Sequence, residues 1–121
     1  MQSHQVGIYS EDLAADYLSA LGYHLIERNY RCSYGEIDSI FQDGDCIVFV
    51  EVKHIGRVGV EALYYQIDHR KRSKILATAK NFLFFHPEYK NLLIRFDVLG
   101  VCVDTKNIKH FINAFEENAL L

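Results

Sequence analysis

Two apolar runs joined by a short Asp-Gly turn signal constrain the fold of this chain more than any other feature. Residues 36–41 and 46–54 are rich in Ile, Val and Phe, and Asp43-Gly44 lies between them. Asp-Gly between two such runs is a strong signal for a tight β-hairpin. The second run, which contains the stretch CIVFVEVKH, is the most strand-like part of the sequence. The sequence therefore predicts an antiparallel hairpin over residues 36–54.

Helical patterns lie on both sides of this hairpin. Apolar residues recur at helical spacing within residues 5–21, and Gly22 is a natural C-terminal stop. A second, long helix is expected over residues 68–85. The order αβββαβ, with one more strand at the end, predicts an α/β fold with a mixed central sheet flanked by helices. The remaining strands are expected at residues 23–31, 92–103 and 108–115.

The length and composition indicate one compact domain over residues 1–121. Half of the residues are hydrophobic, with eight Tyr and eight Phe, so a substantial core is expected. No apolar run is long enough to span a membrane, and the N-terminus lacks an apolar signal region, which favours a cytoplasmic protein. Three widely separated cysteines favour reduced thiols over a disulfide framework or a structural zinc site.

Four charged side chains interrupt the otherwise apolar hairpin. With a two-residue turn at Asp43-Gly44, Glu36 is expected opposite Glu51, and Asp38 opposite Phe49. Because side chains alternate along a strand, Glu36, Asp38, Glu51 and Lys53 then share one face of the sheet.

Such a cluster of charges requires a physical explanation, since a buried, unpaired charge is costly. A hard divalent cation would neutralise the acids, because Mg²⁺ takes oxygen ligands and commonly binds one or two carboxylates. The alternative is a structural ion pair, in which Lys53 pairs with Glu51 or Asp38 at the end of the sheet.

A further acid borders the apolar face of the first helix. Glu11 lies three and seven residues before Ala14 and Leu18, which places it next to the core-facing stripe. An acid early in a helix also complements the helix dipole, and this is the structural explanation. The orientation toward the core makes Glu11 a candidate site residue.

Basic residues gather at the start of the second helix. The net charge of −3 does not suit a protein that binds nucleic acid through bulk charge, yet five of the thirteen Lys and Arg fall within residues 70–80. Cations in a first helical turn oppose the helix dipole, whereas a helix N-terminus attracts phosphate. A solvated surface is the alternative. With the acidic hairpin nearby, we favour nucleic-acid binding by Arg70, Lys71, Arg72 and Lys74.

The motifs of this chain resemble those of the YraN family of small bacterial proteins. The resemblance covers nearly the whole chain, and its most specific part is the series GEID, DGD and VFVEVK in this order. That family is similar to the PD-(D/E)xK nuclease superfamily and to archaeal Holliday-junction resolvases, which implies a restriction-endonuclease-like fold. The matching stretches are EDLAADYL at residues 11–18, GEID at 35–38, DGD at 43–45, VFVEVK at 48–53 and RFDV at 95–98.

The resemblance also implies roles for individual residues. Glu11 matches the helix acid of the superfamily, Asp38 the motif aspartate, and Glu51 and Lys53 the E-x-K signature. By this match Asp38 and Glu51 would hold Mg²⁺ or Mn²⁺ with the carbonyl of Val52, and Glu11 would be an outer or second-metal ligand. Lys53 would orient the attacking water or neutralise developing charge. Further candidates are Glu36 and, by a loose match to a superfamily glutamine, Gln66.

We therefore expect a divalent-metal-dependent endonuclease that hydrolyses DNA phosphodiester bonds, with branched or junction DNA as a candidate substrate. One alternative is a nuclease-fold module that binds nucleic acid or a protein partner without catalysis. Another is a structural domain with ion pairs at the end of its sheet. The acids and the lysine favour the nuclease, because a pure binding module gains nothing from acids that face phosphate. Junction resolvases commonly act as dimers, so the resemblance is compatible with a homodimer.

Overall fold

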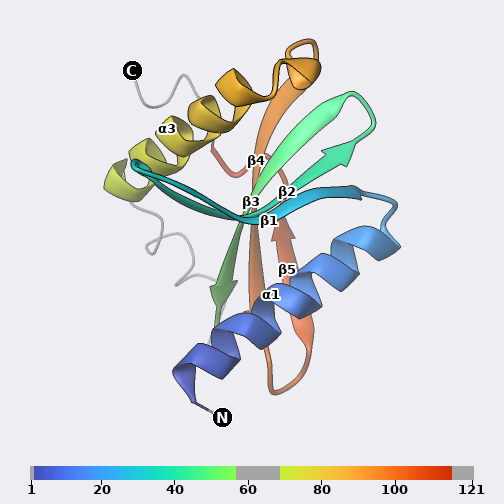
Figure 1. The fold of residues 1–121 in the computed structure, drawn as a ribbon. Coiled ribbons are helices and arrows are strands. Elements are labelled where there is room, and N and C mark those ends of the chain that lie inside the picture. The colour runs from blue at the N-terminus through green and yellow to red at the C-terminus, as the bar shows by residue number, and fades with distance from the viewer. Residues whose placement is uncertain (1, 57–68, 116–121) are drawn as a thin grey trace.

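The computed structural model describes residues 2–56 and 69–115, and it has the α/β architecture expected from the sequence (Figure 1). The candidate Gln66 lies outside the described residues. Within the described ranges, five strands form one mixed sheet in the order β1-β2-β3-β4-β5, in which only the pair β3–β4 is parallel. The elements are α1 (Ser3–Ala20), β1 (His24–Cys32), β2 (Gly35–Asp43), β3 (Cys46–His54), α3 (His69–Phe85), η1 (Pro87–Tyr89), β4 (Leu93–Cys102) and β5 (Asn107–Phe111).

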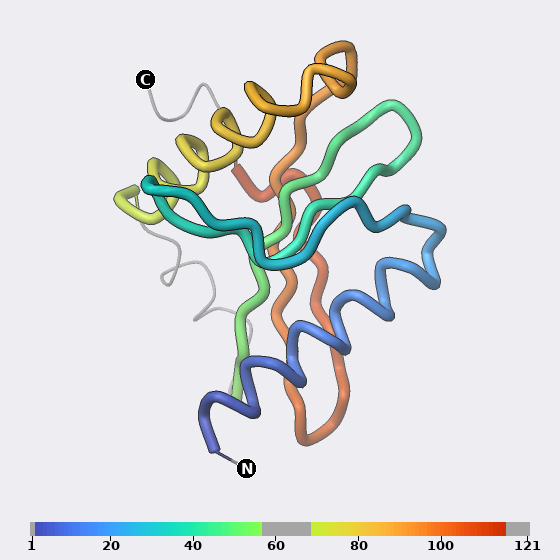
Figure 2. The backbone as a smooth tube through the Cα atoms, in the orientation of Figure 1, coloured from blue at the N-terminus to red at the C-terminus, as the bar shows by residue number. Residues whose placement is uncertain are grey.

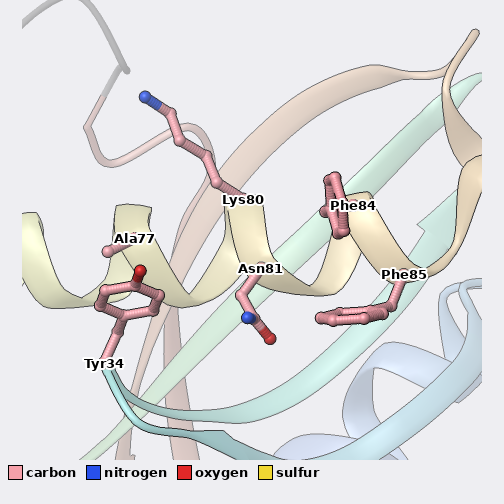
Figure 3. Close-up of a pocket in the computed structure, with 6 residues that line it drawn as sticks. All are labelled: Tyr34, Ala77, Lys80, Asn81, Phe84 and Phe85. Atoms are coloured by element: carbon pink, nitrogen blue, oxygen red, sulfur yellow. The ribbon is translucent and has the colours of Figure 1, made fainter.

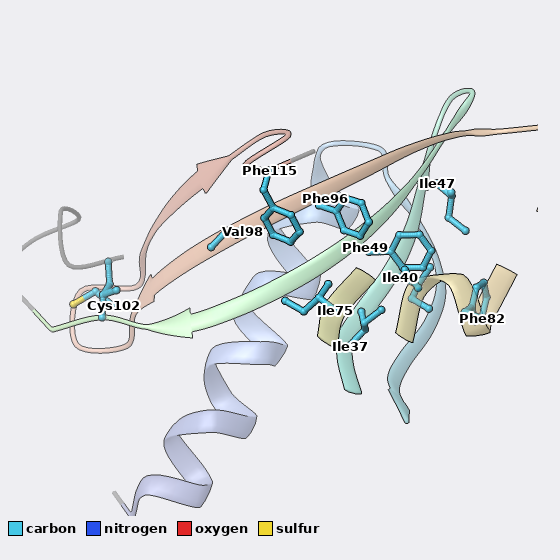
Figure 4. Packing of buried hydrophobic residues seen from close by; sticks show 12 residues of the cluster. Ile37, Ile40, Ile47, Phe49, Ile75, Phe82, Phe96, Val98, Cys102 and Phe115 are labelled. Carbon is cyan, nitrogen blue, oxygen red and sulfur yellow. The ribbon is translucent and has the colours of Figure 1, made fainter. Parts of the chain in front are cut away.

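The two long helices cover opposite faces of the sheet (Figure 2). Strand β3 is buried on both faces, so alternate residues enter different cores. Ile47 and Phe49 pack in the cluster that includes Phe82 of α3, as Figure 4 shows. Val48 and Val50 pack on the other face in the cluster that includes Leu18 of α1. Among the described residues, no helix is long and apolar enough to cross a membrane.

The β2–β3 hairpin has a different register from the one predicted. Asp43 pairs with Cys46, so the two loop residues are Gly44 and Asp45 rather than Asp43 and Gly44. Gly44 has a φ of 59°, and glycine at the first of two loop residues is the preference of a type II′ turn. Phe49 consequently lies opposite Ile40, and the predicted pairs of Asp38 with Phe49 and of Glu36 with Glu51 are wrong. Because the register moves by two residues, the paired residues of β2 and β3, from Ser39 to Asp43 and from Cys46 to Val50, keep their predicted alternation.

Strands β2 and β3 separate at one end of this hairpin and form a fork. Their paired residues end at Ser39 and Val50, whereas β2 stays paired with β1 as far as Gly35. Strand β3 continues along β4 as far as His54. The β1–β2 turn reaches α3, where a Cβ on Gly35 would lie 3.2 Å from Oγ1 of Thr78 (Figure 1). The fork therefore opens between the central strands, beneath the start of α3.

The last strand is shorter than the predicted range of residues 108–115. It ends at Phe111, and Asn113 adopts a left-handed conformation with a φ of 53°. The backbone amide of Asn113 donates to the Asp97 carboxylate at 2.9 Å. The chain then turns inward, and Phe115 stacks on Phe96 with ring centroids 4.9 Å apart. A side chain thus accepts the backbone hydrogen bond that would otherwise have extended the strand.

Asp97 is the centre of a buried polar network on the α1 side of the sheet. Its carboxylate, which is fully buried, accepts hydrogen bonds from Arg95 at 3.0 and 3.1 Å and contacts His110 at 2.7 Å. Arg95 also contacts Asp43 at 3.0 Å and donates to the Tyr23 hydroxyl at 2.6 Å. The charges and polar atoms of this network are paired, so it locks β4, β5 and the β2–β3 hairpin together.

Candidate functional site

Asp38 lies at the point where β2 leaves β3. Its Oδ2 accepts a hydrogen bond of 2.7 Å from the backbone N–H of Val52 on β3. The last backbone-paired residues are Ser39 and Val50, so the Asp38 carboxylate replaces the next hydrogen bond of the ladder. If the register were continued by one residue, Asp38 would face Glu51. The fork thus brings the two predicted carboxylates to neighbouring positions.

Glu51 is buried beneath α3, and two lysines contact it. Only 8% of its surface is exposed. Its Oε1 lies 2.7 Å from Nζ of Lys71 on α3 and 3.6 Å from Nζ of Lys53 on its own strand. Both lysines are partly buried as well, so the ion pairs are shielded from bulk water.

Burial outweighs this neutralisation for both carboxylates. It raises the pKa of Asp38 to about 6, although the hydrogen bond from Val52 opposes the shift. Burial likewise raises the pKa of Glu51 to about 7, and the nearby charge of Asp38 adds to the shift, against the effects of Lys71 and Lys53. The pair therefore resists carrying two negative charges, and an additional cation would favour the ionised state.

The two lysines differ in how readily they lose a proton. Burial lowers the pKa of Lys53, and the adjacent Lys71 lowers it further. Burial also acts against the charge of Lys71, but its hydrogen bonds to Glu51 and Lys53 outweigh that effect and raise its pKa. Lys71 therefore keeps its positive charge beside Glu51, whereas Lys53 is the more easily deprotonated amine of the site.

Glu11 reaches the fork from α1. Its side chain is half-buried, and both its charge and a hydrogen bond to Asp38 contribute to the raised pKa of Asp38. Within residues 2–56 and 69–115, no three or more His, Cys, Asp or Glu side chains converge closely enough to hold a metal ion. The role of Glu11 as an outer or second-metal ligand stays a prediction.

The donor chemistry of the acid pair nevertheless fits a hard divalent cation. Both side chains offer only oxygen, and Mg²⁺ commonly binds one or two carboxylates and completes its shell with water and phosphate oxygens. Glu51 is buried and Asp38 is half-buried, and burial raises the pKa of both carboxylates, so a cation bound between them would favour their ionised forms. Val52 contributes its backbone N–H to Asp38, and the predicted role of its carbonyl stays a prediction.

A pocket of about 240 Å³ opens over the acid pair. Lys71 and Lys74 of α3 line it together with Asp38 and Glu51. Glu36 lies at its edge, where its carboxylate is exposed and contacts Arg31 at 2.9 Å. Glu36 is thus on the predicted face but belongs to a separate surface ion pair.

The basic segment of α3 divides into two parts. Lys71 and Lys74, three residues apart, share the helix face that borders the pocket. Arg72 instead lies over the Phe115 ring, with its guanidinium carbon 5.5 Å from the ring centroid. Arg70 is exposed in the first turn of the helix.

The contact between Lys71 and Glu51 is not predicted by the sequence. Lys71 is expected to bind phosphate with the rest of the basic segment, whereas the structure places its ammonium group on the buried acid. No local spacing connects residues 51 and 71, because they meet only through the packing of α3 on the sheet.

The fold and the forked site define an α/β protein with a restriction-endonuclease-like core. The chain belongs to the uncharacterised protein family UPF0102, whose model matches residues 10–101, and YraN is the common name of this family. A protein of Persephonella marina is 40% identical over 110 residues, which are 91% of this chain and 92% of that protein. A Treponema pallidum (strain Nichols) protein is 39% identical over 117 residues, 93% of each chain. A Clostridium botulinum (strain 657) protein is 38% identical over 115 residues, 92% of this chain and 94% of that protein. All three are named only as UPF0102 proteins.

Proposed function

We propose that the protein is a divalent-metal-dependent nuclease that hydrolyses DNA phosphodiester bonds. One observation carries the proposal. The half-buried carboxylate of Asp38 and the buried carboxylate of Glu51 meet at the fork between β2 and β3, their pKa values are raised, and two lysines lie beside Glu51. A site of this kind favours a divalent cation, which balances the negative charge of the two carboxylates. It also favours a phosphate, whose negative charge is balanced by the cation and the lysines.

Asp38 and Glu51 are the residues that would hold Mg²⁺ or Mn²⁺, with the Val52 carbonyl as a further candidate ligand. Bound there, the ion would lower the pKa of a water molecule and stabilise negative charge on the phosphate. Glu11 lies close enough to Asp38 to influence its pKa, so in this proposal it acts from the outer side of the site.

The lysines supply the remaining chemistry. Lys53 has a lowered pKa and lies 3.6 Å from Glu51, so it is suited to accept a proton from the attacking water or to orient that water. Lys71 balances the charge of Glu51, and Lys74 lines the same pocket, where it can contact a phosphate oxygen.

Cleavage assays test this proposal. Labelled four-way junctions, flaps, duplex and single-stranded DNA would be incubated with Mg²⁺ or Mn²⁺ and wild type, Asp38→Asn or Lys53→Met. Asp12→Asn is the matched control, because Asp12 is an exposed carboxylate of α1 that pairs with Arg28 and does not line the pocket. We expect wild type and the control to cut, and both site variants and EDTA to abolish cutting. Equal cutting by all proteins would indicate a contaminant and would contradict the proposal, as would an absence of cutting on every substrate.

The second candidate is a non-catalytic nucleic-acid-binding or partner-binding module on the same fold. The 2.7 Å contact between Lys71 and Glu51 favours it, because this ion pair neutralises Glu51 without a metal ion. Such a module would bind DNA equally well in EDTA and in Mg²⁺. Neither wild type nor Lys53→Met would cut the DNA.

A further inference from the structure

A pocket lined by aromatic residues lies on the outer side of α3, away from the acid pair. Phe84 and Phe85 are 79% and 65% exposed, and Tyr34 of the β1–β2 turn is 58% exposed. These rings line a pocket of about 500 Å³ together with Lys80 and Asn81 (Figure 3). Large aromatic rings gathered on a surface mark a binding site more often than they mark simple exposure.

This aromatic pocket is connected to the acid pair. A depression of about 370 Å³ along the β1–β2 turn shares Tyr34 with the aromatic pocket. The same depression shares Gly35, Glu36 and Lys74 with the pocket over Asp38 and Glu51. Because neighbouring depressions share lining residues, the three lie in a row, here called the track, from the acid pair past the β1–β2 turn to the exposed rings. Its helical part runs from Lys71 to Phe84, which is about 20 Å at 1.5 Å per residue.

The track combines positive charge with aromatic surface. Lys71, Lys74 and Lys80 lie along it, and the Tyr34, Phe84 and Phe85 rings lie at its far end. The acid on its rim, Glu36, is paired with Arg31. This combination suits a single nucleic-acid strand, whose phosphates meet cations while its unpaired bases stack on rings. A duplex offers no exposed base faces for such stacking, and an apolar partner would strip water from the lysines without supplying negative charge.

We propose that the track binds an unpaired DNA segment and leads it to the acid pair. Its length matches about six stacked nucleotides at 3.4 Å each. The inference rests on the proposed nuclease function and specifies its substrate class. The substrate is DNA with a single-stranded tail or flap next to the phosphate that is cut, in preference to fully paired duplex.

Binding can be measured separately from cleavage. A single-stranded dodecamer that carries 2-aminopurine would be titrated with protein in EDTA, where stacking on a ring quenches the base fluorescence. The chain contains no Trp, so 2-aminopurine can be excited selectively. The informative variants are Phe84→Leu, which keeps an apolar side chain but cannot stack, and Phe84→Tyr, which restores a ring. Leu21→Ala is the control, because Leu21 is a comparably exposed apolar residue at the end of α1.

We expect Phe84→Leu to weaken binding about tenfold and to reduce quenching, and Tyr34→Leu to act in the same direction. Phe84→Tyr and Leu21→Ala should bind like wild type. Unchanged binding by both leucine variants would overturn the inference. Loss of self-association in Phe84→Leu, with unchanged DNA binding, would also overturn it and assign the rings to a second copy of the chain.

Cleavage of tailed and blunt duplexes then separates the two proposals. Ring-dependent binding without cutting of any substrate would support the track and contradict the nuclease function. If tailed and blunt duplexes are cut equally well, and Phe84→Leu cuts like wild type, the result would support the nuclease function and overturn the track. Cutting that requires the tail and weakens in Phe84→Leu would support both.

Discussion

Asp38 and Glu51 make the stability of the protein depend on pH. Their pKa values are raised from 3.8 to about 6 and from 4.5 to about 7 in the folded chain. The folded state therefore binds these protons more tightly than the unfolded state does. The contribution of the pair to the free energy of unfolding falls as the pH rises from about 4 to about 7, and it is least favourable above pH 7.

The first prediction follows from this loss of stability at high pH. Asp38→Asn should increase the free energy of unfolding at pH 8 by about 1–3 kcal/mol, because it removes a half-buried negative charge. The increase should be smaller at pH 5, where Asp38 is already mostly protonated. Its Oδ1 can still accept the hydrogen bond from Val52. Urea unfolding at both pH values measures the difference, with Glu36→Gln as an exposed control. An advantage of Asp38→Asn that does not grow between pH 5 and pH 8 would contradict the assignment.

The second prediction concerns the lysine on the buried acid. Lys71→Met removes the 2.7 Å contact with Glu51 and should lower the free energy of unfolding at pH 8 by about 1–3 kcal/mol. At pH 5 the loss should shrink, because Glu51 is then protonated. Lys74→Met, three residues along the same helix, is the matched control and should have little effect. If Lys71→Met and Lys74→Met had equal free energies of unfolding at pH 8, the Lys71–Glu51 ion pair would not contribute to stability.

At the scale of elements, the close packing of the β1–β2 turn on α3 sets the width of the fork. A Cβ on Gly35 would lie 3.2 Å from Thr78 Oγ1, and that hydroxyl is held by a 2.8 Å hydrogen bond to the Lys74 carbonyl. The neighbouring atoms therefore cannot yield easily. The position of Asp38 depends on this contact, since Asp38 lies three residues along the same strand.

The third prediction compares two glycine substitutions. Gly35→Ala should destabilise the protein by about 1–3 kcal/mol and reduce activity, because it pushes the turn away from α3. Gly7→Ala lies inside α1, where an added Cβ would meet nothing within 4 Å, and it should stabilise the protein by up to about 1 kcal/mol. Thermal unfolding of both variants and a cleavage assay check the contrast. Equal effects of the two changes would show that the turn is not tightly seated.

Much of the fold could be predicted from the sequence, because it depends on local periodicity. The order of helices and strands follows from helical spacing and strand-like apolar runs. The shared face of Asp38 and Glu51 follows from the alternation of side chains along a strand. The register was predicted wrongly because the stretch Asp43-Gly44-Asp45 contains two plausible two-residue turns. The contact of Lys71 with Glu51 depends on how α3 packs on the sheet, which no local pattern encodes.

At the scale of the whole molecule, the candidate site combines parts from distant segments. Glu11 comes from α1, Asp38 and Glu51 from the central hairpin, and Lys71 from α3. A cation at the acid pair would therefore hold these elements together and stabilise the folded chain. Because cation binding requires deprotonated carboxylates, this stabilisation must depend on pH.

The fourth prediction is a pH-dependent effect of metal ions on melting. Mg²⁺ or Mn²⁺ should raise the melting temperature at pH 8, and the rise should become small at about pH 5.5, below the raised pKa values of the pair. EDTA should reverse the rise, and Asp38→Asn should remove it. A rise of equal size at both pH values, or one that persists in Asp38→Asn, would place the ion elsewhere.

The carboxylate at the fork also has an evolutionary consequence. Asparagine at position 38 would keep the hydrogen bond to Val52 and avoid the cost of a buried charge, so selection for stability alone would favour it. A chain evolved in the laboratory only for heat resistance should lose this aspartate early, whereas one evolved under a demand for chemistry should keep it. Under the proposed nuclease function, Asp38 is a position where selection for stability and selection for function act in opposite directions.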